Sequence, residues 1–145
     1  MKYGIDINNE RIFKAISEGL KDRGNFIVDL TEHENIIIGK MLLKKVLIAN
    51  VTNIDFYFAI EFKNSWFNCE IFYEEGTSSK IYGEKIKNLL NSRFKNTVCN
   101  DGQHLYLLKN TKAPVVYVKI PLQYEEKLDG SFLDELINIL RSIEL

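Results

Sequence analysis

The residue types that most often carry out chemistry are scarce in this chain. His33 and His104 are the only histidines, and Cys69 and Cys99 are the only cysteines. A zinc site needs three or four closely arranged His, Cys or carboxylate ligands. The sequence has no Cys-x-x-Cys pair, and nothing at zinc-like spacing supplies a third ligand to either histidine. We therefore predict no metal site at the histidines and two free thiols.

Motifs of other enzyme classes are also missing. There is no glycine-rich phosphate loop and no Gly-x-Ser-x-Gly frame around a serine. Cys99 precedes His104 by five residues, but a catalytic pair needs geometry and not proximity in sequence. The formal net charge of −1 disfavours nucleic-acid or anionic-membrane binding. No stretch approaches the ~18 apolar residues of a membrane span.

Apolar runs alternate with amphipathic segments along the chain, which indicates strands alternating with helices. Asn8 and Asn9 are candidate N-caps of the first helix, which Gly24 ends. Residues 96–102 and 109–114 are predicted loops. Strands are expected at 2–7, 26–30, 55–62, 67–73 and 115–120, and helices at 10–23, 34–49, 79–94 and 131–143.

This order predicts a single α/β domain over residues 1–145, built as three α-β-α layers. The sheet is expected to be mostly parallel, with one antiparallel strand and helices on both faces. Residues 55–62 lack polar alternation, so they are placed at the centre, and 67–73 should hairpin back from them nearer the edge. In helix 34–49, we expect an inner stripe of Ile38, Leu42 and Val46, with Lys40, Lys44 and Lys45 facing water.

Ligands of open α/β sheets bind beyond the carboxyl ends of the strands. The polar residues at or just after these ends are therefore the first candidates for a site. Nearby aromatic residues are expected to belong mainly to the core, although they could also line a groove for sugar or peptide. The polar candidates are Asn8, Asn9, Glu61, Asn64, Lys119 and Gln123, and the aromatic residues are Phe62, Trp66, Phe67 and Tyr73.

Five segments, taken together and in order, resemble the zinc-dependent N-acetylmuramoyl-L-alanine amidases of type 3. The likeness runs over nearly the whole chain, and its specificity lies in the succession of segments. "YGIDINN" stands where the family has Asp-x-Gly-His-Gly, and "DLTEHE" resembles its Leu-Thr-Arg turn. "IANVTNIDFYFAIEFKNS" resembles its Ala-Asn and its Asp-led strand ending in Ser-x-His-x-Asn-Ala. The other two segments are "CEIFYEEGTSSKIYGEKI" and "LYLLKNTKAPVVYVKIPL".

The resemblance implies a site in which the zinc ligands and the catalytic glutamate have been replaced. The family holds zinc with two histidines and a glutamate, and a further glutamate acts as general base. The histidine positions correspond to Asn9 and Glu61, and the catalytic glutamate corresponds to Lys119. The ligand glutamate falls in a shortened stretch, where Glu10 is the nearby carboxylate. We therefore predict no bound zinc and no catalytic residue.

We hypothesise that an ion pair takes the place of the zinc ion. If Glu61 and Lys119 end adjacent buried strands, the ammonium can stand opposite the carboxylate where a cation used to be. A buried pair of this kind is costly unless further hydrogen bonds satisfy it, and Asn9 or Asn64 is placed to supply them.

The functional prediction is a catalytically inactive amidase-like protein that binds through Asn9, Glu61, Asn64 and Lys119. Its ligand would be a peptidoglycan fragment or a protein, such as an active amidase or another wall component. One alternative is a divergent active amidase, bacterial or phage-derived, with metal held by Glu10, Glu61 and a histidine. Another is a structural or assembly protein on the same fold. The lack of an export signal predicts a cytoplasmic location, although a phage lysin domain or a piece of a longer chain would look the same.

Overall fold

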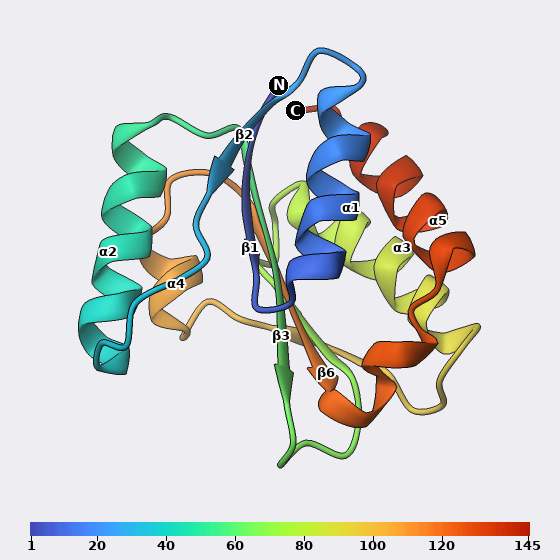
Figure 1. The fold of residues 1–145 in the computed structure, drawn as a ribbon. Coiled ribbons are helices and arrows are strands. Elements are labelled where there is room, and N and C mark those ends of the chain that lie inside the picture. Colours follow the sequence, from blue (N-terminus) through green and yellow to red (C-terminus); the bar gives the residue numbers. More distant parts are fainter.

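The computed structural model describes residues 1–145, which form one six-stranded sheet with helices on both faces (Figure 1). The strands are ordered β2-β1-β3-β6-β4-β5, and all neighbours are parallel except the antiparallel pair β4–β6. The predicted α/β class and mostly parallel sheet are confirmed. The elements are β1 (Lys2–Ile7), α1 (Glu10–Lys21), β2 (Phe26–Asp29), α2 (Ile38–Val51), β3 (Phe56–Lys63), β4 (Glu70–Tyr73), α3 (Ser79–Asn91), β5 (Val98–Asp101), α4 (Tyr106–Asn110), β6 (Val115–Pro121), the 3-10 helix η1 (Leu122–Lys127) and α5 (Gly130–Arg141).

The central place of β3 is as predicted, but the partner of β4 is not. β4 does not hairpin onto β3, because β6 lies between them. β6 pairs with β3 over seven positions, from Tyr57–Val115 to Lys63–Pro121, whereas β4 has only four residues. Two long apolar strands side by side satisfy more backbone groups and bury more apolar surface than a short hairpin would.

Three elements were not predicted, namely β5, the short helix α4 and the 3-10 helix η1. β5 lies in the segment expected to be a polar loop and extends the sheet beside β4. Its residues are exposed or half-buried, which suits a short edge strand and leaves little apolar signal in the sequence. The 3-10 helix η1 follows β6 directly, where Pro121 ends the strand.

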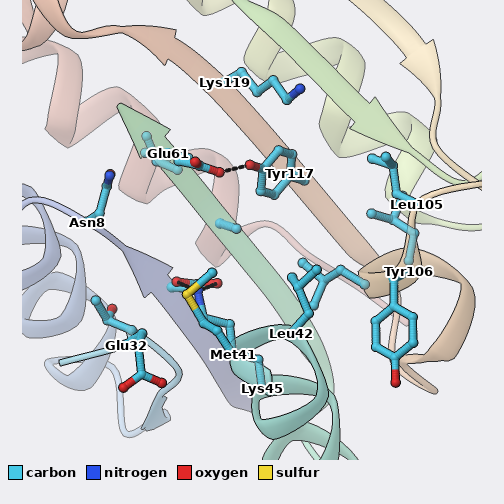
Figure 2. Close-up of a pocket in the computed structure, with 16 residues that line it drawn as sticks. Asn8, Glu32, Met41, Leu42, Lys45, Glu61, Leu105, Tyr106, Tyr117 and Lys119 are labelled. Atoms are coloured by element: carbon cyan, nitrogen blue, oxygen red, sulfur yellow. Dashed lines mark hydrogen bonds and ion pairs between the residues drawn. The ribbon is translucent and has the colours of Figure 1, made fainter. Parts of the chain in front are cut away.

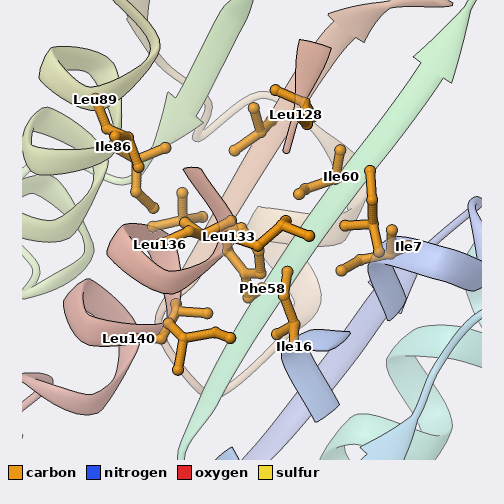
Figure 3. Close-up of a cluster of buried hydrophobic side chains, with 14 of the residues drawn as sticks. Ile7, Ile16, Phe58, Ile60, Ile86, Leu89, Leu128, Leu133, Leu136 and Leu140 are labelled. Carbon is orange, nitrogen blue, oxygen red and sulfur yellow. The ribbon is translucent and has the colours of Figure 1, made fainter. Parts of the chain in front are cut away.

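One face of the sheet is covered by α1, α3 and α5 (Figure 1). These helices and the strand residues beneath them form a cluster of 27 buried hydrophobic residues, part of which is drawn in Figure 3. Ile16, Phe58, Phe132 and Leu140 are all at most 1% exposed there. This face therefore holds most of the hydrophobic core.

The opposite face is covered by α2 and the short α4 (Figure 1), over a second cluster of only ten buried hydrophobic residues. α2 contributes just Val46 and Ala49 to it. The predicted inner stripe is partly wrong, because Ile38 is 69% exposed at the start of the helix. Lys45, expected to face water, points inward instead, with a side chain only 12% exposed. None of the helices has the length and apolar character needed to span a bilayer.

Candidate functional site

The parallel strands β1, β3 and β6 bring their carboxyl ends to the same edge of the sheet, as predicted. Glu61 and Lys119 are direct partners across the β3–β6 ladder, so their side chains leave the same face. Asn8 and Asn9 follow β1 at that edge. The four residues thus converge on one region, but their side chains have separate roles.

Asn8 acts as an extension of the β-sheet. Its Nδ2 donates to the carbonyl oxygen of Phe62 at 3.1 Å, and the Phe62 N–H donates to Asn8 Oδ1 at 2.8 Å. Both ends of the amide are therefore used in joining the chain after β1 to β3. Sequence reasoning had named Asn8 as a candidate at the strand end and as a possible N-cap, but the N-cap of α1 is Asn9.

Asn9 is the N-cap of α1, as its place after a strand predicted. Its Oδ1 accepts the backbone N–H of Ile12 at 3.0 Å, which satisfies one of the free donors of the first turn. Its Nδ2 donates to Glu125 Oε1 at 2.9 Å, and Arg11 pairs with the same oxygen at 3.1 Å. The Asn9 side chain thus caps α1 and joins it to η1 through Glu125.

Glu61 and Lys119 do not form the predicted ion pair. The Glu61 carboxylate accepts a hydrogen bond from the Tyr117 hydroxyl (Figure 2). The Lys119 ammonium extends away from it and lies 5.0 Å from the centre of the Trp66 ring and 5.1 Å from that of Phe72. The hypothesis of an ammonium replacing the lost cation is therefore wrong, because the aromatic rings draw the lysine to their faces.

The other predicted polar residues are open to solvent, whereas the predicted aromatic residues differ in exposure. Asn64 is exposed in the turn after β3 and makes no side-chain hydrogen bond, so it does not support Glu61. Gln123 is exposed on η1. Among the aromatic residues, Phe67 is 82% exposed and belongs to no core, in contrast to the expectation. Phe62 and Tyr73 are buried, as expected.

A cavity lies between the sheet and α2, immediately beneath the edge just described (Figure 2). It has a volume of about 320 Å³. Its apolar wall comes from α2, β3 and the segment around α4, and Glu61, Tyr117 and Lys119 reach it from the sheet. Clefts of this kind, mostly apolar with a few polar groups, are typical small-molecule sites. The apolar lining residues are Met41, Leu42, Ala59, Ile60, Leu105, Leu107 and Leu108.

A buried polar cluster forms the floor of this cavity. Lys45 Nζ lies 3.0 Å from both carboxylate oxygens of Asp6, and the Tyr57 hydroxyl donates to Asp6 Oδ2 at 2.8 Å. Burial raises the pKa of the Asp6 carboxyl, and the neighbouring Lys45 and Tyr57 oppose this rise only in part. Desolvation likewise raises the pKa values of Tyr57 and Tyr117, so both hydroxyls stay protonated and act as donors.

Sequence reasoning missed this cluster of Asp6, Lys45, Tyr57 and Tyr117. A signal was present, because Asp6 is a lone carboxylate inside an otherwise apolar strand. A buried charge needs a partner, so Asp6 required a cation from the helix packed on that face. The helical period alone placed Lys45 toward solvent.

The residues do not fit the family's zinc ion. No three His, Cys, Asp or Glu side chains lie together in a group that could hold a metal. Asn9 is used as a helix cap, Lys119 carries a positive charge, and Glu61 is the one anionic ligand between them. Glu10 and His33 line a smaller hollow beside the end of β1, but Glu61 does not reach it. His33 pairs with Asp29 at 2.9 Å, and His104 is exposed.

Comparisons of sequence and structure with known proteins differ in outcome. No family model and no curated protein matches the sequence. Solved structures do match the fold. The catalytic domain of the CD27L endolysin, described as targeting Clostridia difficile, has a TM-score of 0.78 at 16% identity, over 100% of this chain and 99% of that one. This chain has the fold of the N-acetylmuramoyl-L-alanine amidases.

Two further structures support the amidase fold. An N-acetylmuramoyl-L-alanine amidase from Clostridium difficile 630 gives a TM-score of 0.64 at 15% identity, over 96% of this chain and 91% of that chain. The CwlD amidase from Clostridioides difficile, solved in complex with the GerS lipoprotein, gives 0.60 at 17% identity, over 96% and 93%. The family resemblance seen in the sequence is thus matched by the fold over nearly the full length of these domains.

Proposed function

We propose that this chain is a catalytically inactive protein of the amidase fold that binds a cell-wall fragment. The proposal rests on the contacts of the three residues that the sequence resemblance aligns with two zinc histidines and the catalytic glutamate of the amidases. Asn9 caps a helix, Glu61 accepts from a tyrosine, and Lys119 lies over aromatic rings. A hydrolytic zinc site needs three protein ligands and an open position for water, which this set does not provide.

The crevice beside these residues supports a binding role. The cavity beneath α2 is open to the same edge and combines an apolar wall with Glu61 and Lys119. Exposed Phe67, next to Trp66, adds an apolar surface beyond the end of β3. Carbohydrate and peptide ligands both present apolar faces alongside hydrogen-bonding groups, so a mixed surface of this kind suits a wall fragment.

The proposed loss of catalysis is tested by metal analysis together with a wall-lysis assay. We expect purified protein, with or without added zinc, to hold less than one zinc per chain after dialysis and to leave the turbidity of a cell-wall suspension unchanged. Stoichiometric zinc together with wall lysis would support the alternative of a divergent amidase and would contradict the proposal.

The binding role is tested with soluble muropeptides in a calorimetric titration. Glu61→Gln should weaken binding about tenfold, since it removes a charged group from the crevice. Glu135→Gln changes an exposed carboxylate on α5 and serves as the matched control, with no change expected. If wild-type protein does not bind muropeptides, the role in wall binding fails.

A protein partner is the second candidate, and a specific feature favours it. α2 leaves several large apolar side chains open to solvent, among them Leu43 at 46%, Leu47 at 54% and Val51 at 77% exposed. These three are spaced four residues apart and therefore share one side of the helix. Exposed apolar surface of this kind often marks a contact with another protein. Co-sedimentation with an active amidase, lost in Leu47→Lys, would support this candidate.

A further inference from the structure

The cavity beneath α2 has the size and lining of a site for a small, largely apolar molecule. Its volume of about 320 Å³ lies at the lower end of the range for small-molecule pockets. Met41, Leu42, Leu105 and Leu108 supply flexible apolar walls from α2 and the α4 region. Such walls favour an aliphatic or aromatic group of a few carbon atoms, whether a whole small molecule or the apolar part of a larger ligand.

Most charged groups around the cavity form ion pairs, but Glu61 and Lys119 do not. Lys45 takes both oxygens of Asp6 at 3.0 Å, and Lys44 pairs with Glu32 at 3.6 Å. Glu61 has no cation within ion-pair distance, although it is half-buried on the cavity wall. Its partner in the structure is the neutral hydroxyl of Tyr117.

An ionised carboxylate accepts up to about four hydrogen bonds, and Glu61 receives one from a side chain. A carboxylate held away from bulk water is stabilised most by a charged donor. Tyr117 supplies no positive charge, since a phenol is neutral when protonated; burial raises its pKa, so it remains a neutral donor. The remaining acceptor capacity of Glu61 thus faces a cavity that is otherwise mostly apolar.

We infer that this cavity binds a small ligand with an apolar body and a protonated amine, and that Glu61 pairs with the amine. The inference rests on the proposed binding role of the crevice and names the chemical class of its ligand. The ammonium donates to Glu61 while the hydrocarbon part lies against the leucines and Met41. No covalent step is involved.

Lys119 sharpens the inference because it lines the same cavity with a positive charge. It is the direct ladder partner of Glu61, yet its ammonium lies over the rings of Trp66 and Phe72. A ligand ammonium at Glu61 would meet a like charge nearby. Removing Lys119 should therefore strengthen amine binding, whereas neutralising Glu61 should weaken it.

The test is a comparison of n-hexylamine with n-hexanol on the whole chain at pH 7, by ligand titrations in NMR. The alkylamine is protonated at this pH, since its pKa resembles the ~10.4 of lysine. We expect hexylamine to bind at least about tenfold more tightly than hexanol, the value of a charge-assisted hydrogen bond. Glu61→Gln should remove the preference, and Lys119→Met should increase it. Glu135→Gln, on the far side of the sheet, should leave it unchanged.

Equal binding of the amine and the alcohol, or a preference that survives in Glu61→Gln, would overturn the inference. If Glu61→Gln does not fold, the inference is still tested by the ratio of the hexylamine and hexanol affinities of the wild-type protein. Nuclear Overhauser effects between the hexylamine methylenes and the Met41 methyl group are the second measurement. If these nuclear Overhauser effects are absent, the amine binds elsewhere and the inference is overturned. Muropeptide binding without an amine preference defeats this inference alone, whereas an amine preference without muropeptide binding defeats only the wall-binding proposal.

Discussion

On one face of the sheet, α1, α3 and α5 close over a cluster of 27 buried hydrophobic residues, whereas on the other face α2 and α4 close over ten. The larger cluster is continuous and apolar (Figure 3). The smaller one surrounds a buried ion pair and borders a cavity, and its main helix buries only Val46 and Ala49. The two faces therefore differ in both packing and polarity.

This difference indicates on which face of the sheet the fold tolerates changes of polar and charged residues. Hydrophobic burial is the main favourable term in folding, so the α1-α3-α5 face carries most of the stability. The α2 face contributes less and holds the polar residues that reach the carboxyl edge, including Asp6 and Glu61. Residues at this edge can therefore vary with little effect on the fold, because the larger core does not depend on them.

The largest effect is expected from Phe132→Ala in α5, which empties a site that is 1% exposed in the larger cluster. Deleting a buried aromatic ring costs about 3 to 5 kcal/mol through lost burial and a residual cavity. Urea unfolding followed by circular dichroism measures the loss. Leu42→Ala, on the half-buried wall of the α2 cavity, is the matched change on the other face and should cost clearly less. Equal losses would remove the distinction between the faces.

Lys45→Met should destabilise the protein by about 3 kcal/mol at pH 7, because it leaves the buried Asp6 carboxylate without its cation. The methionine retains the apolar stem, so the change isolates the charge. Lys44→Met is the control on the same helix: its ammonium is 3.6 Å from Glu32 and its side chain is 48% exposed. That control should change the free energy of unfolding by at most about 0.5 kcal/mol. A similar loss in both variants would show that the inward ion pair has no special importance.

Asp6 should also make the free energy of unfolding depend on pH. This effect should be smaller than that of removing the Lys45 ammonium. Burial raises its pKa in the folded state above the ~3.9 of an unfolded chain. Between the two pKa values the native state binds more protons, so the stability contributed by Asp6 is complete below pH ~3.9 and is lost as pH rises through the folded pKa. The free energy of unfolding of wild type minus that of Asp6→Asn, measured across this range, should fall with rising pH. A rising difference would mean that Lys45 outweighs desolvation.

Asn9→Ala should cost about 1 kcal/mol, since it removes the N-cap of α1 and the hydrogen bond to Glu125. Asn9→Ser keeps a capping oxygen and should recover most of the loss. Thermal unfolding of the two variants gives the comparison. If the alanine and serine variants are equally stable, the side chain of Asn9 does not stabilise the protein as an N-cap, and its assigned structural role is wrong.

The smallest effect is expected at the outer side of α2. Leu47→Lys replaces a side chain that is 54% exposed and should change stability by less than about 0.5 kcal/mol. Chemical denaturation is the measurement. A loss above about 1 kcal/mol would show that α2 is packed as tightly as the helices on the opposite face, and would contradict the comparison.

Much of the fold could be predicted from local patterns. The lack of alternation in 55–62 predicted the central β3, and Asn9 was correctly taken as an N-cap. β5 was missed because its four residues are exposed or half-buried at the sheet edge and give little apolar signal in the sequence. The insertion of β6 between β3 and β4 was also missed, since strand order depends on which long-range pairing buries the most surface.

By itself, the sequence determined the α/β class and the convergence of Asn9, Glu61 and Lys119 at one edge of the sheet. Only the tertiary structure decided what each side chain contacts. Lys45 turned inward to Asp6, and Lys119 turned from Glu61 to Trp66 and Phe72. Periodicity and order along the chain define elements and faces, but a charged side chain is long enough to choose among several partners, and that choice depends on groups brought close by folding.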